Sequence, residues 1–249
     1  MEASITLIKY RKRYLYFALT AMGLHSLVLF FNRNIRFHKT LGCGKDGSFS
    51  KWPDWQQWGV LVVKDKISND LKPGATKQEL LKSIYGPFLA GWWKFFGCET
   101  WTVILQPLEG HGTWNGKQAF GQLPHKSDYE GPIAILTRAS IRISKLNRFW
   151  EHIGGAASDM EKADGFLFSQ GIGEWLWIRQ ATLSFWQSKE QMKQFAYKMK
   201  NHAEIIRKTK QEKWYSEDMF VRFKVLKTEG TLNGIDPLAR LLAPSVQNH

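Results

Sequence analysis

Alternation of apolar and polar positions along the chain predicts a set of β-strands. The runs have a period of two and many β-branched or aromatic residues, and they begin at Ile5 (ITLIKY), Trp58 (WGVLVVK), Thr100 (TWTVILQPLEG), Pro132 (PIAILTRASI), Ile178 (IRQATLSFW) and Met219 (MFVRFKVLKTEG). Apolar residues at helical spacing instead predict helices over Tyr14–Phe31, from Thr76, from Lys145 to about Ile153 and from Ser188. The pattern therefore predicts a mixed α+β chain.

The predicted elements occur in the same order twice. GTWNG (Gly112–Gly116) recurs as GTLNG (Gly230–Gly234), and each copy follows a strand-like run. The helix upstream of each copy opens with a capping box, in which side chain and backbone satisfy each other's hydrogen bonds; the pairs are Thr76 with Glu79 and Ser188 with Gln191. Because each half reads β-α-β-β-α-β, we predict an α+β fold of two tandem ferredoxin-like repeats, residues 1–125 and 126–249.

An uncharged run, Tyr14–Phe31, is just long enough to span a bilayer and has basic residues on both sides. Thr20, Gly23, His25 and Ser26 interrupt it, and no small-residue cleavage site follows, which argues against a signal peptide. A ferredoxin-like unit needs a helix at this place. We therefore interpret the run as the first crossover helix, apolar because it packs on the sheet, with a membrane span as the alternative.

Two segments carry closely spaced glycines, FHKTLGCGKDG from Phe37 and FLFSQGIGEW from Phe166. They lack the Lys-Ser/Thr pair of a P-loop and the third spaced glycine of a dinucleotide fingerprint. We interpret them as strands that lead into turns requiring glycine, and we predict no nucleotide site.

Composition narrows the class of partner. The formal net charge of +13 attracts nucleic acid, anionic membranes and acidic proteins alike. The lysines are spread around the predicted helices without an aromatic RNP-like strand, so we predict no nucleic-acid binding. Cys43 and Cys98 are the only cysteines and have no zinc or disulfide spacing, which favours a reducing, cytoplasmic setting. The 12 tryptophans and 16 phenylalanines supply walls for a flat, apolar ligand.

One histidine lies near the apolar stripe of the helix that begins at Ser188. The stripe consists of Met192, Phe195, Ala196, Met199, Ala203 and Ile206. His202 follows Met199 by three positions and lies roughly 60° from the centre of the stripe, on the side facing the sheet. Such an imidazole is either a half-buried side chain bonded to a backbone carbonyl or an axial ligand of a metal or haem. Both interpretations stay open on this evidence.

Two other histidines are weaker candidates. His152 lies well off the apolar stripe of its own helix, which is typical of a surface or helix-end residue, whereas His25 lies inside the apolar first helix and could face a pocket. No two histidines show the i,i+4 spacing with a carboxylate that indicates a zinc site.

Polar residues alternate with apolar ones along two of the predicted strands. They are Arg179, Gln180 and Thr182 on one strand and Arg222 on the other. If this face lines a pocket, Arg179 or Gln180 could polarise bound dioxygen or hold a propionate, and otherwise it is a solvated strand face. The large aromatic residues nearby, Trp150, Trp186 and Trp214, belong either to the core or to a pocket wall.

The second half resembles a known family. The matching motifs are the G-x-G-E segment at Gly171–Glu174, the Gln-Ala-Thr-x-Ser-x-Trp strand ending at Trp186, the F-A-x(5)-H-A-E-x-I helix from Phe195, the W-(F/Y)-x-E-(D/E) entry to the last strand and its ending in E-G-T-x-N-G. These motifs are similar to those of the spheroidene monooxygenase family, the acyclic carotenoid 2-ketolases. The resemblance covers most of Ile5–Gly234 and is weakest across Asp65–Glu130. WLW (Trp175–Trp177) stands where the family has a proline-containing stretch.

The resemblance implies a dimeric α+β barrel-type fold and an enzyme that contains haem b. Such an enzyme oxidises the C2 position of acyclic carotenoids to a ketone with dioxygen and an external reductant. The second repeat would then carry the haem site, with His202 as the iron ligand and with Phe195, Met199 and Trp186 in contact with the cofactor. Arg179 and Gln180 would be catalytic. His152 and His25 remain alternative ligands.

Several partners follow from the same resemblance. The basic surface would dock an acidic electron donor such as a ferredoxin, or an anionic membrane in which the carotenoid resides, so that a cytoplasmic protein touches the membrane at its periphery. A homodimer is left open. Two other functions are also left open: a haem-dependent dehydratase or peroxidase-like enzyme, and a non-catalytic barrel that binds haem or another hydrophobic ligand.

Overall fold

The computed structural model describes residues 1–45, 47, 50–67, 74–175, 177–198, 207–209 and 211–242. The elements of the first half are β1 (Glu2–Lys9), η1 (Lys12–Tyr14), α1 (Leu15–Phe30), β2 (Phe37–Gly44), β3 (Pro53–Lys64), α2 (Lys77–Tyr85), α3 (Pro87–Phe95) and β4 (Glu99–Gly112). Those of the second half are β5 (Ile133–Ile141), η3 (Ile143–Lys145), α4 (Leu146–Glu161), β6 (Phe166–Trp175), β7 (Arg179–Trp186), α5 (Lys189–Lys198), β8 (Tyr215–Gly230) and α7 (Ala239–Leu242). The predicted boundary at residue 125 falls between β4 and β5.

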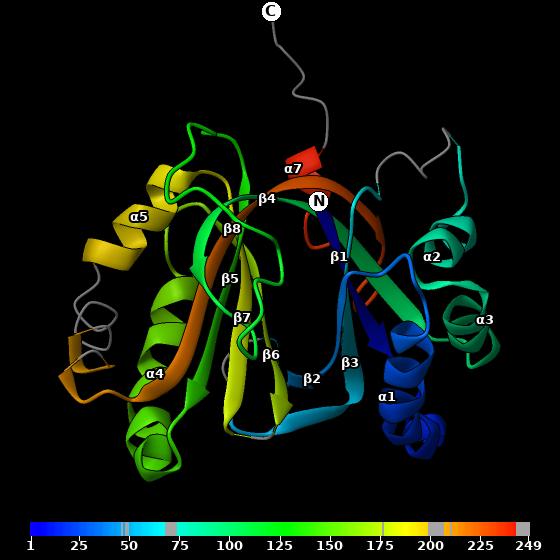
Figure 1. The fold of residues 1–249 in the computed structure, drawn as a ribbon, viewed down its shortest axis with the longest axis horizontal. Coiled ribbons are helices and arrows are strands. Elements are labelled where there is room, and N and C mark those ends of the chain that lie inside the picture. Colours follow the sequence, from blue (N-terminus) through cyan, green and yellow to red (C-terminus); the bar gives the residue numbers. More distant parts are fainter. Residues whose placement is uncertain are drawn as a thin grey trace, which may run out of the picture.

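The strands of the described chain close into one antiparallel barrel in the order β1-β3-β2-β6-β7-β5-β8-β4 (Figure 1). Each half contributes four neighbouring strands, and the halves join where β4 pairs with β8 and where β2 pairs with β6. The predicted α+β fold of two ferredoxin-like repeats is therefore confirmed, and the barrel closes within a single chain.

The repeated sequence signals produce repeated local structure. Asn115 and Asn233 both adopt a positive φ, 54° and 56°, and each is followed by a glycine that does the same. Short bridges, Trp114 with Lys117 and Leu232 with Ile235, close the two turns. Asparagine and glycine tolerate this backbone region better than other residues, which explains why both copies keep the pair.

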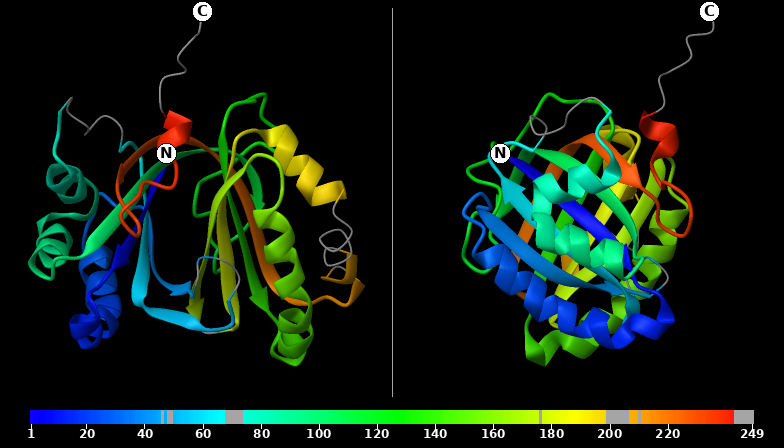
Figure 2. Two further views of the ribbon diagram at one scale, coloured as in Figure 1. Left: turned by 180° about the vertical axis from the view of Figure 1, so that it is seen from behind. Right: turned by 90° about the vertical axis from the view of Figure 1, so that its right-hand side faces the viewer.

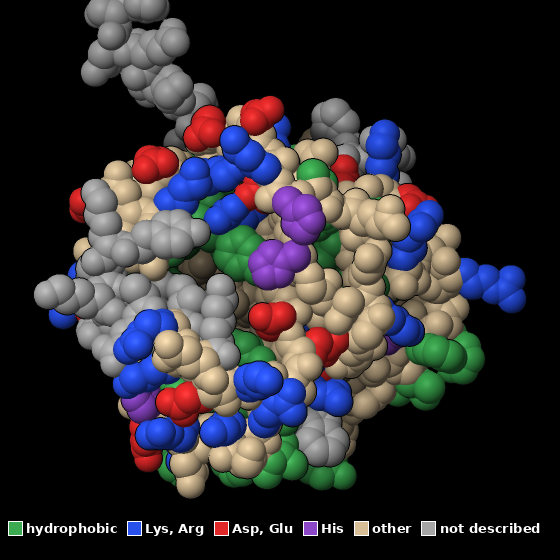
Figure 3. Space-filling model, turned by 60° about the vertical axis from the view of Figure 1, so that its left-hand side comes forward, with side chains coloured by type: hydrophobic (Ala, Val, Ile, Leu, Met, Phe, Trp, Pro, Cys, Tyr) green, Lys and Arg blue, Asp and Glu red, His purple; other side chains and the backbone are tan. Residues whose placement is uncertain are grey.

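The helices lie on the outside of the barrel. Figures 1 and 2 show α1, α2 and α3 along the outer side of the first half, and α4 and α5 along that of the second. The predicted capping box of Thr76 and Glu79 opens α2, and Ser188 accepts a hydrogen bond from the backbone N–H of Gln191 at the start of α5. Seen from the side of the second half, the surface is hollowed, with hydrophobic side chains inside the hollow and charged and histidine side chains around it (Figure 3).

Helix α1 is the predicted crossover helix. Contrary to what we had expected, however, many of its large apolar residues do not pack on the sheet. Its buried residues are mostly small: Ala18, Ala21, His25 and Leu29. Its larger apolar side chains point outward: Tyr16, Phe17, Leu19, Leu27 and Phe30 are all exposed. Only 22% of the span Lys12–Phe30 is buried, and by length and composition this span could cross a membrane. Packing on the sheet therefore does not explain the hydropathy of this helix.

The prediction that the closely spaced glycines belong to strands leading into turns is correct for the end of the first segment, where β2 ends at Gly44 and Gly47 beyond it has a positive φ of 85°. It is wrong for Gly42, which lies inside β2, and for Gly171 and Gly173, which lie inside β6. These two strands meet at the seam between the halves, where Gly42 pairs with Gly173. The inward neighbours Cys43 and Ile172 belong to the barrel core, so the glycines occupy the alternate, outward positions. At these positions the two strands present only backbone to the outer surface of the seam.

Candidate functional site

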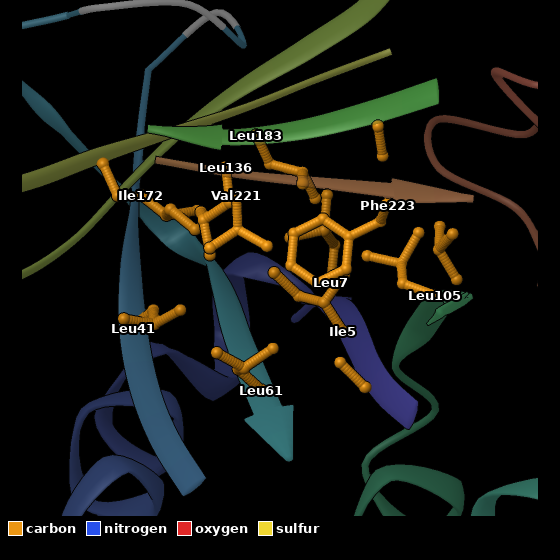
Figure 4. Packing of buried hydrophobic residues seen from close by; sticks show 14 of the residues in the cluster. Ile5, Leu7, Leu41, Leu61, Leu105, Leu136, Ile172, Leu183, Val221 and Phe223 are labelled. Atoms are coloured by element: carbon orange, nitrogen blue, oxygen red, sulfur yellow. The ribbon is translucent and has the colours of Figure 1, made fainter. Parts of the chain in front are cut away.

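The interior of the barrel is filled with apolar side chains. Leu7, Leu41, Leu136, Leu183 and Phe223 are among the buried residues that point inward from both halves (Figure 4). A packed interior of this kind has a density close to that of an organic crystal and leaves no room for a flat ligand. A site for a large ligand therefore has to lie outside the barrel, between the sheet and its helices.

The outer face of β7 carries a row of polar side chains. Ala181, Leu183 and Phe185 point into the barrel core, so the alternate residues face the helices: Gln180, Thr182, Ser184 and Trp186. Strand β5 pairs beside this row, with Thr137 opposite Thr182. This outer face, between β7 and β8, is the candidate functional site.

Two neighbouring threonines on this face differ in exposure. Thr137 is exposed although it lies in the middle of β5, which is paired on both sides. Its neighbour Thr182 is buried, and its hydroxyl has no hydrogen-bond partner among the described residues. Because a buried polar group without a partner is unfavourable, this hydroxyl beside an exposed strand position makes the face a candidate for binding a ligand.

A buried charge cluster lies at one end of the same face. Glu109 accepts a hydrogen bond from Lys189 at 2.9 Å and another from Arg222. Burial alone would raise the pKa of Glu109, but the hydrogen bonds from Lys189 and Arg222 outweigh it and hold the pKa below its ordinary value. The Nε atom of Arg222 is buried without a partner among the described residues, so this guanidinium keeps one donor for an acceptor.

The structure separates the two residues that we expected to be catalytic. Gln180 points outward and lines a cavity of about 280 Å³ near the seam. Arg179, the next residue on the strand, lies on the opposite face of the sheet, where its Nη1 atom is 3.4 Å from the Oε2 atom of Glu174. Burial would raise the pKa of Glu174, but a hydrogen bond and charge from Lys39 and a hydrogen bond from Trp114 lower it, so Arg179 faces a carboxylate. Of the two, Gln180 is the one placed at the candidate site.

Two of the expected cofactor contacts lie together. Trp186 and Phe195 are both buried, with ring centroids 5.2 Å apart, in the apolar layer between α5 and the sheet. They lie at one end of the polar row on β7, ~20 Å along the strand from Gln180. His202 and Met199, the expected iron ligand and its neighbour, lie outside the described residues.

The alternative histidine ligands have other surroundings. His152 donates or accepts at both ring nitrogens, with Nδ1 2.8 Å from the carbonyl of Arg148 and Nε2 3.1 Å from Nζ of Lys208. His25 lies in the first half, edge-on against Trp92 and Trp93 at 5.7 Å each. Burial lowers the pKa of His25 to about 4, so it is neutral.

Some residues of the site carry no sequence signal of their own. Thr137 is a threonine in a β-strand like any other, and only its exposure in the folded sheet distinguishes it. Lys189 and Glu109 are far apart in the chain, and neither belongs to a recognisable motif. The polar alternation did indicate Thr182 and Arg222, although not which face of the strand the helices cover.

The chain was compared with protein families and with solved structures. No protein-family model matches it. Two crystal structures of aldoxime dehydratase share its fold at 10% sequence identity. The one in complex with butyraldoxime has a TM-score of 0.57, with 91% of this chain and 79% of that chain covered. The other has a TM-score of 0.55, with 90% and 80% covered. This likeness supports the dimeric α+β barrel fold.

Three relatives are more similar to this chain in sequence than these solved structures are. Spheroidene monooxygenase of Rhodobacter capsulatus is 31% identical over 207 residues, which cover 82% of this chain and 81% of that protein. Spheroidene monooxygenase of Rubrivivax gelatinosus is 32% identical over 200 residues, covering 80% and 72%. Spheroidene monooxygenase of Cereibacter sphaeroides is 31% identical over 222 residues, which cover 89% of this chain and 64% of that protein. The chain therefore belongs to the spheroidene monooxygenase family.

Proposed function

We propose that this protein is a haem-dependent monooxygenase that oxidises the C2 position of an acyclic carotenoid to a ketone, using dioxygen and an external reductant. The observation that carries the proposal is the similarity to three curated relatives named spheroidene monooxygenase. Two successive hydroxylations at one carbon give a geminal diol, which loses water to form the ketone. Each hydroxylation consumes one dioxygen, two electrons and two protons and releases one water.

The outer face of the second-half sheet is the proposed haem site. Two observations support this choice: Thr137 is exposed in the middle of the sheet, and the buried hydroxyl of Thr182 has no partner among the described residues, which a bound group could supply. Bound haem would supply the activation of dioxygen that no amino-acid side chain provides. His202 would hold the iron, Trp186, Phe195 and Met199 would be its apolar contacts, and Arg222 would pair with a propionate.

The chain's own polar groups would serve the reaction by position and by hydrogen bonding. Gln180 and Thr182 lie two residues apart on the same face of β7, and both side chains are donors. A donor fixed in apolar surroundings stabilises developing negative charge more strongly than it would in water. We assign the two residues this role, with Gln180 nearer to the seam. Arg179, on the other face, is no longer part of the proposed machinery.

The absorption spectrum of the haem-loaded protein tests this proposal. We expect a Soret band in the wild type, its loss or shift in His202→Ala, and an unchanged band in His152→Ala, whose ring nitrogens are already engaged. With a reduced ferredoxin as the electron donor, spheroidene should be oxygenated by the proteins that keep the Soret band and not by those that lose it. A normal Soret band and haem content in His202→Ala would refute the ligand assignment, and no haem binding by the wild type would refute the haem proposal.

The exposed face of α1 extends the proposal to the membrane. Phe17 and Phe30 are exposed on this helix, and basic residues flank it at both ends: Arg11, Lys12 and Arg13 before it, Arg33 and Arg36 after it. Apolar side chains between basic ends suit the interface of an anionic bilayer. Co-sedimentation with phosphatidylglycerol vesicles should therefore fall in Phe17→Ser/Phe30→Ser. Equal binding by the wild type and this variant would exclude α1 as the contact.

A further inference from the structure

A groove runs along the seam between the two halves, on the outside of the barrel. Its cavity of about 280 Å³ lies between α1 of the first half and α4 of the second. Leu19 and Met22 contribute from α1, and Trp150 contributes from α4. Below them, β2 and β6 pair directly, through Gly42 with Gly173 and Cys43 with Ile172. The groove is therefore built jointly by the two repeats.

The floor of the groove is bare backbone. Gly42, Gly44, Gly171 and Gly173 all line the cavity, and all take the outward positions of their strands. A Cβ atom added at Gly42 would meet the carbonyl of Gly173 and the ring of Trp58 at 3.8 Å each, which is ordinary van der Waals contact. At Gly42 there is therefore space for a side chain, whereas a Cβ atom added at Gly173 would lie 2.9 Å from the carbonyl oxygen of Arg179. Glycine in a strand interior is unfavourable by itself and is typical of a place where a ligand approaches the backbone.

Indole rings wall the groove. Trp55 and Trp58 line it from β3, Trp150 from α4, and Trp177 from the turn between β6 and β7. Trp177 has a positive φ of 69°, which is unfavourable for a bulky side chain. Two hydrogen bonds hold it there: its Nε1 donates to the carbonyl of Lys51 at 3.0 Å, and its own carbonyl accepts from Nε1 of Trp150 at 3.3 Å. Strain of this kind is typical of residues held in place for a ligand.

The groove leads to the polar row on β7. Gln180 lines it, and Thr182 follows two residues further along the same face of the strand. Glu174 is also among the lining residues, but its carboxylate lies on the inner face of the sheet, where Lys39 at 2.7 Å and Nε1 of Trp114 engage it. Glycine backbone and indole rings make up much of the groove, with Gln180 near the candidate site. Ser50, Lys51 and Asp54 are the further polar residues of its lining.

We propose that this groove binds the terminal segment of an acyclic carotenoid and directs its end toward Gln180 and Thr182. A conjugated polyene is flat and apolar, so it can lie on bare backbone and stack against indole rings. The volume is close to the lower end of the range for ligand pockets, about 300 Å³, which suits one end of a long chain rather than all of it. The identity of the ligand rests on the proposed function.

Filling the floor tests the groove from the sheet side. The probe is spheroidene in detergent, titrated into the whole chain without reductant, with binding followed by quenching of tryptophan fluorescence. Gly42→Leu should weaken binding about tenfold, because the new side chain displaces two or three carbons of the ligand. Gly91→Leu is the matched control, since Gly91 lies on α3 and a Cβ atom added there would meet nothing within 4 Å. The control should bind within about twofold of the wild type.

A charge introduced from the helix side gives a second test that does not disturb the strand. Leu19 and Leu27 are both exposed on α1, 47% and 55%, but only Leu19 is among the residues lining the groove. Leu19→Glu should weaken binding of spheroidene about tenfold, and Leu27→Glu should not. Wild-type affinity in both folded variants, Gly42→Leu and Leu19→Glu, would overturn the proposal. Equal weakening in Leu19→Glu and Leu27→Glu would overturn it as well.

The binding assay separates this proposal from the proposed function. It requires neither haem nor turnover, so absence of a Soret band refutes the haem proposal and leaves the binding difference between Leu19→Glu and Leu27→Glu in place. Conversely, a haem-loaded wild type that oxygenates spheroidene while all four variants bind it equally would retain the proposed function and refute the groove.

Discussion

Replacing His25 with leucine should remove a defined part of the acid sensitivity of folding. His25 is 3% exposed and packs edge-on against Trp92 and Trp93. Burial lowers its pKa to about 4, whereas a histidine of the unfolded chain titrates at about 6.5. Its Nε2 atom has no partner among the described residues, so nothing nearby compensates the charge of the imidazolium. Leucine is apolar, does not titrate, and suits a helix.

The sign and size of the effect follow from these two pKa values. Because the folded state has the lower pKa, the unfolded state binds the proton more tightly, and stability falls as the pH drops below about 6.5. Between pH 7.5 and pH 5 the loss from this one group is about 2 kcal/mol, and below pH 4 it approaches about 3 kcal/mol. At higher pH, His25 does not contribute to the pH dependence of the free energy of unfolding.

Urea unfolding followed by tryptophan fluorescence, at pH 7.5 and at pH 5, measures this loss. Carboxylates and other histidines contribute equally in the wild type and in His25→Leu, so the difference between the two proteins isolates His25. We expect the loss of stability on acidification to be about 2 kcal/mol smaller in the variant. The same loss in both proteins would refute a buried, neutral His25.

Three further predictions concern other residues. Thr182→Val should raise the free energy of unfolding by about 1 kcal/mol in a urea titration, because a buried hydroxyl without a partner is removed. The same variant should oxygenate its substrate more slowly when loaded with haem. A lower free energy of unfolding would show that the hydroxyl of Thr182 has a partner after all. Glu217→Ala should lower stability by about 2 kcal/mol in a urea titration, because Arg138, 1% exposed, loses its carboxylate partner at 2.6 Å and keeps only Asn115 and the more distant Glu174. Burial raises the pKa of Glu217, but hydrogen bonds from Gly116, Thr113 and Arg138 outweigh it and lower the pKa to about 2. The stability of the wild type should therefore fall as the pH drops from about 4.5 toward 2. This part of the fall should be missing in Glu217→Ala. Gly112→Ala should lower the thermal midpoint of unfolding more than Gly116→Ala does. Both glycines have a positive φ, but a Cβ atom at Gly112 would lie 2.2 Å from the carbonyl oxygen of Asp218, whereas one at Gly116 would meet nothing within 4 Å. Equal shifts in the two variants would contradict this difference.

The fold could be predicted from the sequence because its signals are local and occur twice. The period of the strands, the capping box at Thr76 and the paired Asn-Gly turns each depend on residues within a few positions of one another, and each recurs in the other half. Closure of the barrel within one chain was not predictable in this way. It depends on β2 meeting β6 and β4 meeting β8, which are pairings between residues more than a hundred positions apart.

The candidate site was predictable in part. Alternation along β7 indicated that Gln180 and Thr182 share a face, but the same alternation fits a solvated strand, and only the tertiary structure shows that Thr182 is buried. Glycine is a turn signal and a ligand-contact signal at once, so Gly42 and Gly173 were misread. Hydropathy cannot distinguish a buried helix from one whose large side chains face outward, and α1 was misread for that reason.

The two seams of the barrel are unequal, and this determines where the molecule opens first. Strands β4 and β8 pair along most of their length, from Trp101–Gly112 to Met219–Gly230, whereas the described residues of β2 and β6 pair at two neighbouring positions. This second seam is supported by hydrogen bonds from Gln170 to the carbonyl of Gly44, from Gly171 to the carbonyl of Gly47 and between Gln57 and Gln170. Thermal fluctuations should therefore part the halves at β2 and β6 while β4 and β8 act as a hinge. Amide hydrogens of Cys43 and Ile172 should exchange with deuterium well before those of Val103 and Val221. A barrel that opens along one line can admit a stiff, elongated molecule without unfolding.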